Sequence, residues 1–209
     1  MTPSTRGFRE MKAAVVRFAG DSGDGMQIVG ERFTDTSVTV PNAIATFPDY
    51  PAEIRAPIGT IAGVSAFQVH FGSQTVLTPG DEPDALVAMN PAALAVHLYD
   101  LAEGGLLIVN SAAFTDENLA MAGFATNPLD DPALKKKYDV MPIDITGLAV
   151  EALKESPLSM KDKLRTKNFF ALGFTYWVYG RPLDPTIEYI TKKWGTKAPD
   201  VADANIRVL

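Results

Sequence analysis

The stretch AAVVRFAGDSGDGMQ, residues 13–27, decides the fold class of this 209-residue chain. Residues 13–19 are apolar at nearly every position, which predicts a central strand that is buried on both faces. The glycine-rich residues 20–25 follow, and residues 26–39 then carry apolar side chains at helical spacing. A strand, a glycine-rich turn and the start of a helix, in this order, form a ligand-facing corner in α/β proteins.

The turn itself predicts a binding site lined by backbone. Its glycines allow positive φ angles and a close ligand, and the next helix directs N–H groups and its positive dipole end to the same place. The carboxylates of Asp21 and Asp24 disfavour an anion, and we expect them to cap the helix or its turn. The turn matches neither the dinucleotide fingerprint nor the P-loop, so a purely geometric turn is the alternative. The candidate binding residues are Gly20, Asp21, Ser22, Gly23, Asp24, Gly25 and Met26.

Strand and helix patterns alternate along the rest of the chain. Apolar runs at residues 85–89, 106–109 and 140–143 are typical of buried strands, and helical patterns follow them. This alternation predicts a three-layer α/β/α domain with a mostly parallel, Rossmann-like sheet. Residues 66–71 alternate as a strand does, and we expect residues 75–77 to pair with them.

The same patterns predict the domain boundaries. Residues 1–10 are polar and aperiodic, which predicts a flexible leader. Residues 11–195 form the main domain, which includes a long apolar helix within residues 161–179 and an amphipathic helix over residues 182–194. Residues 196–209 are expected to form a C-terminal helix or the start of a linker to a further domain.

A second conspicuous stretch, AIATFPDYPAEIRAP at residues 43–57, predicts a short strand that runs into a loop stiffened by three prolines, which suggests presented side chains. The candidates for substrate binding or a subunit contact are Tyr50, Glu53, Arg55 and, farther along, Asn90. Arg55 suits a carboxylate or phosphate, with Glu53 orienting it, but a Glu–Arg pair that braces the turn fits equally. Asn90 follows a strand, where open sheets bind ligands, and it also fits as the cap of the next helix.

Composition excludes several classes of function. The net charge of -6 and the sequence pI of about 4.9 provide no basic surface for nucleic acid. The chain has no cysteine, which excludes a thiolate metal site and an iron–sulfur cluster of its own. The two histidines, His70 and His97, lack a second ligand at metal spacing, so no metal site is predicted. Without a signal peptide or an apolar run that spans a bilayer, a soluble cytoplasmic protein is expected, with no membrane contact.

Five stretches, in order, resemble the gamma subunit or gamma domain of 2-oxoacid:ferredoxin oxidoreductases. They are residues 20–27, 46–57, 63–71, 80–90 and 167–173. The first two look most like the 2-oxoglutarate members, in which the gamma domain is fused ahead of the alpha domain. The resemblance implies the gamma-type fold of these enzymes, with residues 11–195 as the gamma domain and residues 196–209 leading toward an absent alpha domain.

The resemblance also implies a function. Such an enzyme decarboxylates a 2-oxoacid on thiamine diphosphate, passes electrons through [4Fe–4S] clusters to ferredoxin and transfers the acyl group to coenzyme A. Thiamine diphosphate, Mg²⁺ and the clusters lie in the alpha and beta components, so this chain alone should be inactive. The gamma domain covers the active site and helps to bind coenzyme A, for which residues 20–26 are the natural contact. The chain stops at Leu209, so we expect either a separate gamma chain or a piece of a fused gamma–alpha subunit.

Two alternatives remain at this point. One is a stand-alone α/β module that binds a nucleotide or a flavin, and the other is a purely structural subunit whose turn touches no ligand. No nucleophile elbow or metal-binding carboxylate cluster stands out, so no catalytic residue is predicted. Neither the identity of the 2-oxoacid nor the physiological direction follows from the sequence.

Overall fold

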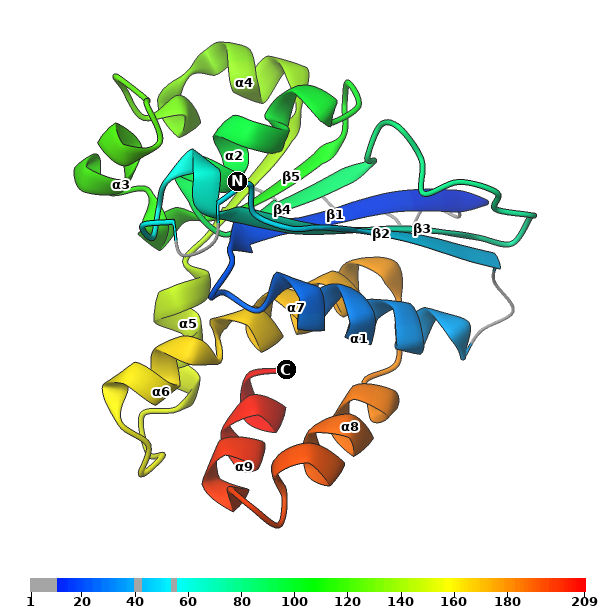
Figure 1. Ribbon diagram of the computed structural model, residues 1–209, viewed down its shortest axis with the longest axis vertical. Coiled ribbons are helices and arrows are strands. Elements are labelled where there is room, and N and C mark those ends of the chain that lie inside the picture. Colours follow the sequence, from blue (N-terminus) through cyan, green and yellow to red (C-terminus); the bar gives the residue numbers. More distant parts are fainter. Residues whose placement is uncertain (1–10, 40–42, 54–55) are drawn as a thin grey trace, which may run out of the picture.

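A computed structural model describes residues 11–39, 43–53 and 56–209. Its strands form one sheet in the order β2-β3-β1-β4-β5-β6 (Figure 1). Strands β1, β4, β5 and β6 are parallel, and β3 runs antiparallel to both of its neighbours, β1 and β2. The expected mostly parallel sheet is therefore confirmed. The strands are β1 (Ala13–Asp21), β2 (Ala43–Asp49), β3 (Val64–Gly72), β4 (Ala85–Ala88), β5 (Leu106–Asn110) and β6 (Asp139–Ile143).

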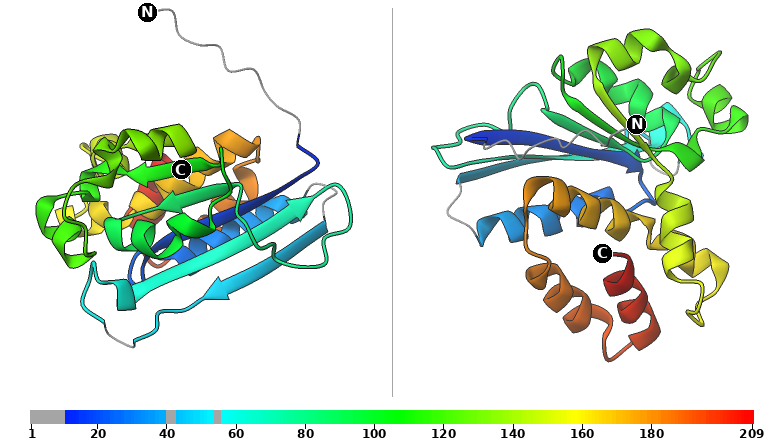
Figure 2. Two further views of the ribbon diagram at one scale, coloured as in Figure 1. Left: turned by 90° about the horizontal axis from the view of Figure 1, so that it is seen from above. Right: turned by 180° about the vertical axis from the view of Figure 1, so that it is seen from behind.

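Helices cover both faces of the sheet. On one face lie α2, α3 and α4, and on the other lie α1 and α7, with α8 and α9 beyond them (Figures 1 and 2). The α-helices are α1 (Met26–Val38), α2 (Pro91–His97), α3 (Asp116–Met121), α4 (Pro132–Lys137), α5 (Ile145–Ala152), α6 (Met160–Arg165), α7 (Lys167–Tyr179), α8 (Asp184–Trp194) and α9 (Pro199–Val208). Short 3-10 helices are Ile61–Gly63, Leu98–Asp100, Ser111–Ala113 and Pro128–Asp130. Each face has its own hydrophobic core, so the three-layer prediction holds.

Phe33 of α1 is the centre of the larger core. Its ring is fully buried and lies 5.4 Å from the rings of Phe18 and Phe71 and 5.8 Å from that of Tyr176. The hydroxyl group of Tyr176 donates to the backbone oxygen of Arg32 at 2.8 Å. These contacts fix α1 between the sheet and α7, which determines where the preceding glycine turn lies.

Of two sequence-based expectations about local structure, one was wrong and one is confirmed. Residues 75–77 form no strand, because β3 already has β1 on one side and β2 on the other. The long apolar helix expected within residues 161–179 is confirmed as α7, and Thr166 separates it from the short helix α6. The Thr166 hydroxyl donates to the backbone oxygen of Lys163 at 2.7 Å, so its side chain closes α6. The expected leader at residues 1–10 lies outside the described residues.

A buried polar network links the sheet to α2. Arg17 of β1 donates from Nε to Gln68 Oε1 at 2.8 Å, and its guanidinium also contacts His97 Nδ1 at 3.1 Å and forms an ion pair with Asp100. His97 is buried, and within the described part of the chain its Nε2 has no hydrogen-bond partner. Burial, and after it the charge of Arg17, lowers the pKa of His97. The neutral imidazole is therefore the form that fits the fold.

This histidine should make stability depend on pH. The pKa of His97 is lower in the folded state than the ordinary value of 6.5, so the unfolded chain binds the proton more tightly. The contribution of neutral His97 to the free energy of unfolding is then fully present above about pH 6.5. It falls as the pH drops toward the folded-state pKa, by at most about 1.4 kcal/mol per pH unit. We expect urea unfolding between pH 7 and pH 5.5 to show this slope, and His97→Gln to flatten it. An equal slope in both proteins would contradict the assignment.

Candidate functional site

The glycine turn lies where several strands end, at the carboxyl edge of the parallel part of the sheet. Asp21 ends β1, Asn90 follows β4, and Asn110 ends β5. The helix α1 begins after Gly25, which has a left-handed conformation with φ 75°. Among the described residues no side chain caps this helix, so its first N–H groups face the turn uncapped. This is the edge at which open α/β sheets bind ligands.

Asp21 points toward Gly59, just beyond the proline-rich stretch. Its carboxyl group is only 8% exposed, and Oδ1 accepts a hydrogen bond from the Gly59 N–H at 3.0 Å. Burial raises the pKa of Asp21, and the hydrogen bond from Gly59 opposes that rise. Beside it, the Ser22 N–H donates to the Gly63 carbonyl at 3.0 Å. Two hydrogen bonds thus join the glycine turn to residues 56–63, and Asp21 is not free to face a ligand.

Asp24 braces the turn from the other side. Its Oδ2 accepts from the Asp21 N–H at 3.2 Å, and its Oδ1 forms an ion pair with Lys167 Nζ at 2.8 Å. Two roles were expected for these carboxylates: neither caps α1, but Asp24 does cap an N–H of the turn. The sequence could not indicate the ion pair, because Lys167 comes from α7, far along the chain.

The three glycines of the turn have different roles. A Cβ atom on Gly20 would lie 3.1 Å from Met89 Cβ, and one on Gly25 would lie 2.6 Å from Asn168 Nδ2. Close packing explains Gly20, and close packing together with the left-handed conformation explains Gly25. Gly23 is exposed, and a Cβ atom there would meet no atom within 4 Å. Gly23 is therefore the position of the turn whose backbone is open to a ligand.

The other candidate residues are dispersed. Tyr50 is 68% exposed, and the side chain of Glu53 is exposed while its N–H donates to the Ala62 carbonyl at 3.2 Å. Arg55 lies outside the described residues. Asn90 Oδ1 accepts from the Ala93 N–H at 2.8 Å, so Asn90 is the cap of α2. The structure thus brings Asn90 close to the turn in a structural role.

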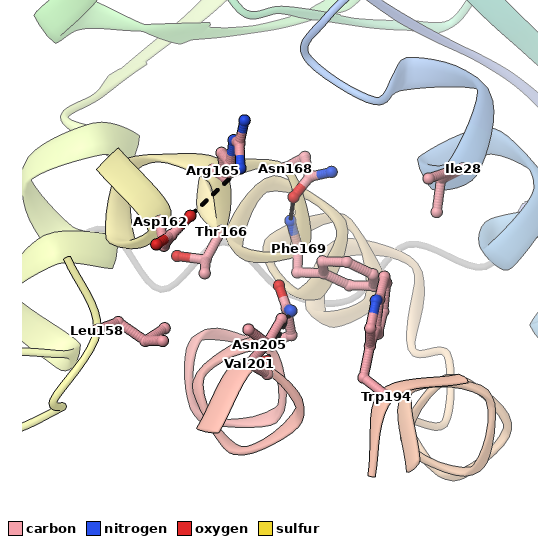
Figure 3. A pocket seen from close by; sticks show the side chains of 10 residues that line it. All are labelled: Ile28, Leu158, Asp162, Arg165, Thr166, Asn168, Phe169, Trp194, Val201 and Asn205. Atoms are coloured by element: carbon pink, nitrogen blue, oxygen red, sulfur yellow. Dashed lines mark hydrogen bonds and ion pairs between the residues drawn. The ribbon is translucent and has the colours of Figure 1, made fainter. Parts of the chain in front are cut away.

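Sequence reasoning missed the residues that α7 contributes. Lys167 and Asn168 begin this helix and lie against the turn. Asn168 also lines a cavity of about 270 Å³ between α1, α6, α7, α8 and α9, together with Ile28, Arg165 and Trp194 (Figure 3). The only sequence signal was the stretch at residues 167–173, which supported the resemblance without pointing to a role.

Across residues 11–39, 43–53 and 56–209, no group of three or more His, Asp or Glu side chains could hold a metal ion. Within the same ranges, no helix has the length and the apolar character needed to cross a membrane.

Known proteins resemble this chain along nearly all of its length. A family model described as pyruvate ferredoxin/flavodoxin oxidoreductase matches residues 15–209. The chain is 48% identical, over 201 residues, to the 2-oxoglutarate oxidoreductase subunit KorA of Mycobacterium tuberculosis, covering 96% of this chain and 30% of that protein. It is 26% identical, over 156 residues, to the ketoisovalerate oxidoreductase subunit VorA of Methanothermobacter thermautotrophicus, covering 68% and 30%. The chain thus spans less than a third of each curated relative.

Solved structures share the fold at lower identity. The 2-oxoglutarate:ferredoxin oxidoreductase from Magnetococcus marinus matches with a TM-score of 0.72 and 22% identity, covering 95% of this chain and 30% of that one. The pyruvate oxidoreductase subunit PORC of Thermotoga maritima matches with a TM-score of 0.61 and 20% identity, covering 95% and 93%. The gamma-type fold is therefore confirmed. With the family model matched over residues 15–209, the chain belongs to the pyruvate ferredoxin/flavodoxin oxidoreductase family.

Proposed function

We propose that this chain is the gamma component of a 2-oxoacid:ferredoxin oxidoreductase that acts on 2-oxoglutarate. The observation that carries the proposal is the 48% identity to KorA, a 2-oxoglutarate oxidoreductase subunit, over 96% of the chain. The order of the five sequence stretches agrees with it. A stand-alone nucleotide or flavin module is disfavoured by the family, whose members compared above are subunits of oxidoreductases.

The chemistry of the reaction belongs to other components. Without cysteine the chain offers no thiolate to a [4Fe–4S] cluster, so its residues do not fit that group. We assign the clusters, thiamine diphosphate and Mg²⁺ to the alpha and beta components, through which ferredoxin is reduced. Alone, this chain should be inactive. Tyr50 and Glu53, which are exposed on the proline-rich loop, together with Arg55, are then candidates for contact with those components or with substrate.

Coenzyme A is the co-substrate that this chain helps to hold. The related enzyme from Magnetococcus marinus has 2-oxoglutarate, coenzyme A and succinyl-CoA bound. In this chain the open backbone at Gly23 lies just before the uncapped N-terminus of α1, a combination that favours phosphate groups. The thin pantetheine arm can pass along a backbone that carries no side chain. The alternative of a purely structural subunit gives no reason for this open backbone.

Gly23→Val tests the coenzyme A role. In the assembled enzyme we expect the KM for coenzyme A to rise about tenfold, because the new side chain fills the space where the ligand would pass. The KM for 2-oxoglutarate should stay within about twofold, since no reacting group is touched. The fold should persist, because no atom lies within 4 Å of the added Cβ.

Gly23→Ala is the graded control, with a smaller rise in the same KM. Thermal unfolding of both variants should resemble that of the parent protein. Unchanged coenzyme A kinetics in Gly23→Val would refute the role of the turn. Failure of the native chain to purify with a thiamine-binding and a cluster-bearing partner would refute the gamma assignment itself.

A further inference from the structure

Building on the coenzyme A role proposed above, we propose that Gln27 is a positioning residue of that site. Gln27 lies in the first turn of α1, two residues after Gly25 of the glycine turn. Its side-chain amide holds the end of β2, and with it Tyr50, in a fixed place relative to the turn. The effect of Gln27 on coenzyme A is thus indirect and is exerted through Tyr50.

Three hydrogen bonds converge on the amide nitrogen of Gln27. Nε2 donates to the Asp49 carbonyl oxygen at 3.1 Å, to Ser65 Oγ at 3.0 Å and to the Ala66 carbonyl oxygen at 2.9 Å. Because the amide has two hydrogens, the three acceptors share them. Asp49 is the last residue of β2, and it lies opposite Ala66 of β3. One side chain of α1, which packs against β2 and β3 (Figure 1), therefore joins both strands to the start of the helix.

Ser65 reinforces the same junction. It is only 4% exposed, and its hydroxyl group donates to the Asp49 carbonyl oxygen at 3.2 Å. The Asp49 carbonyl oxygen thus accepts from two side chains, each carried by a regular element. A connected polar network of this kind fixes one geometry more strictly than apolar contacts do. Packing of α1 on the sheet does not require it, since buried Val29 and Phe33 supply that packing.

Tyr50 directly follows the residue that Gln27 holds. It is 68% exposed, so most of its side chain is open to contact. Three residues later the Glu53 N–H donates to the Ala62 carbonyl oxygen at 3.2 Å, and the next carbonyl group, that of Gly63, accepts from the glycine turn. The short segment that carries Tyr50 is therefore fixed at both ends to the frame of the turn. A ligand that contacts Tyr50 then loses little binding free energy to ordering of the backbone.

Gln27→Glu in the assembled oxidoreductase tests this role. The substitution keeps the size of the side chain, removes the N–H donors and places a carboxylate against carbonyl oxygens. We expect the KM for coenzyme A to rise about tenfold, because a displaced Tyr50 disturbs the bound geometry. The KM for 2-oxoglutarate should stay within about twofold.

Ser65→Ala is the graded variant. It removes one of the three acceptors and one donor to Asp49, so the KM for coenzyme A should rise less, by about threefold. If Gln27→Glu does not fold, an unchanged KM for coenzyme A in Ser65→Ala overturns the proposal.

Gln68→Glu is the matched control, because the same substitution breaks a similar clamp on another loop. Gln68 Nε2 donates to the carbonyl oxygens of Pro79 and Gly80 at 2.8 and 2.6 Å. The control should lower the unfolding temperature and leave both KM values unchanged. If it raises the KM for coenzyme A as much as Gln27→Glu does, any loosening of β3 produces the effect and the proposal fails.

A double-variant cycle tests whether Gln27 acts through Tyr50. Tyr50→Ala should raise the KM for coenzyme A about tenfold. Adding Gln27→Glu to it should change that KM by less than about twofold, because the side chain that Gln27 positions is then absent. Effects that multiply in the double variant would contradict the proposal. An equal rise in the KM for 2-oxoglutarate, or loss of partner binding, would give Tyr50 a different contact and would also overturn it.

The outcome with Gly23→Val separates this inference from the proposed function. If Gly23→Val raises the KM for coenzyme A and neither Gln27→Glu nor Tyr50→Ala does, this inference fails and the proposed function stands. If none of the three substitutions changes it, the coenzyme A role fails and this inference with it.

Discussion

Gly30→Ala is expected to lower the free energy of unfolding by about 2–3 kcal/mol, although alanine normally stabilises a helix relative to glycine by about 1 kcal/mol. Gly30 lies in α1 where this helix crosses β3. An added Cβ atom would lie 2.1 Å from Cγ and 2.5 Å from Cβ of Phe67. The Phe67 side chain is buried between α1 and the sheet, so α1 must move away from β3 to relieve the overlap.

Urea unfolding at pH 7 measures this effect. Gly23→Ala is the matched control, because it adds the same methyl group seven residues earlier, where no atom lies within 4 Å, and should change stability by less than about 0.5 kcal/mol. A stable Gly30→Ala protein would mean that the Phe67 ring can yield. The packing that places the glycine turn would then be looser than the contact distances imply.

Local patterns predicted the strands that are buried on both faces but not the arrangement of the whole sheet. Strand β1 and helix α1 were found because nearly every position of residues 13–19 is apolar and the helix begins after three glycines. The insertion of β3 between β2 and β1 has no local signal, since it depends on which strands pair in space. The wrong expectation for residues 75–77 has the same cause.

In the candidate site, too, the local pattern was predicted from the sequence and the contacts between distant segments were not. The glycine turn was found because glycine spacing between a strand and a helix is a local pattern. The partners of its two aspartates, Gly59 and Lys167, are 38 and 143 residues away along the chain (59 − 21 and 167 − 24), so only the fold reveals them. From the sequence alone, the carboxylates of Asp21 and Asp24 are unexpected in a turn of the kind that suits anions. The structure shows that each has a partner within the protein.

Asp21→Ala tests whether residues 56–63, the loop that is bonded to the glycine turn, are part of the proposed coenzyme A site. It removes the acceptor of the Gly59 N–H, which is costly at a buried position, by about 1–3 kcal/mol. Of the two hydrogen bonds that join residues 56–63 to the turn, the variant keeps only the one from the Ser22 N–H. Because small displacements disturb the geometry in which a substrate is bound, we expect kcat/KM for coenzyme A in the assembled enzyme to fall about tenfold or more.

Asp21→Asn separates this positioning role from charge. Its side-chain oxygen can still accept from Gly59, so activity should be retained. Burial raises the pKa of Asp21, so the folded state favours the protonated carboxyl group. The stabilisation that Asp21 provides in this form is complete below the unfolded-state pKa of about 3.8 and is lost as the pH rises through the folded-state pKa. At pH 7 the buried charge is a cost, so Asp21→Asn should be at least as stable as the parent protein.

Thr60→Ala is the control for the loop, because it removes a hydroxyl that bonds Pro57 within the loop and leaves both hydrogen bonds to the turn. If Asp21 served only the stability of the fold, Asp21→Ala would lower the free energy of unfolding and leave the KM for coenzyme A unchanged relative to that for 2-oxoglutarate. Loss of activity in Asp21→Asn as severe as in Asp21→Ala would instead make the charge itself the requirement. The expected result, rescue by asparagine with a selective effect on coenzyme A, requires that the hydrogen bond to Gly59 positions the loop.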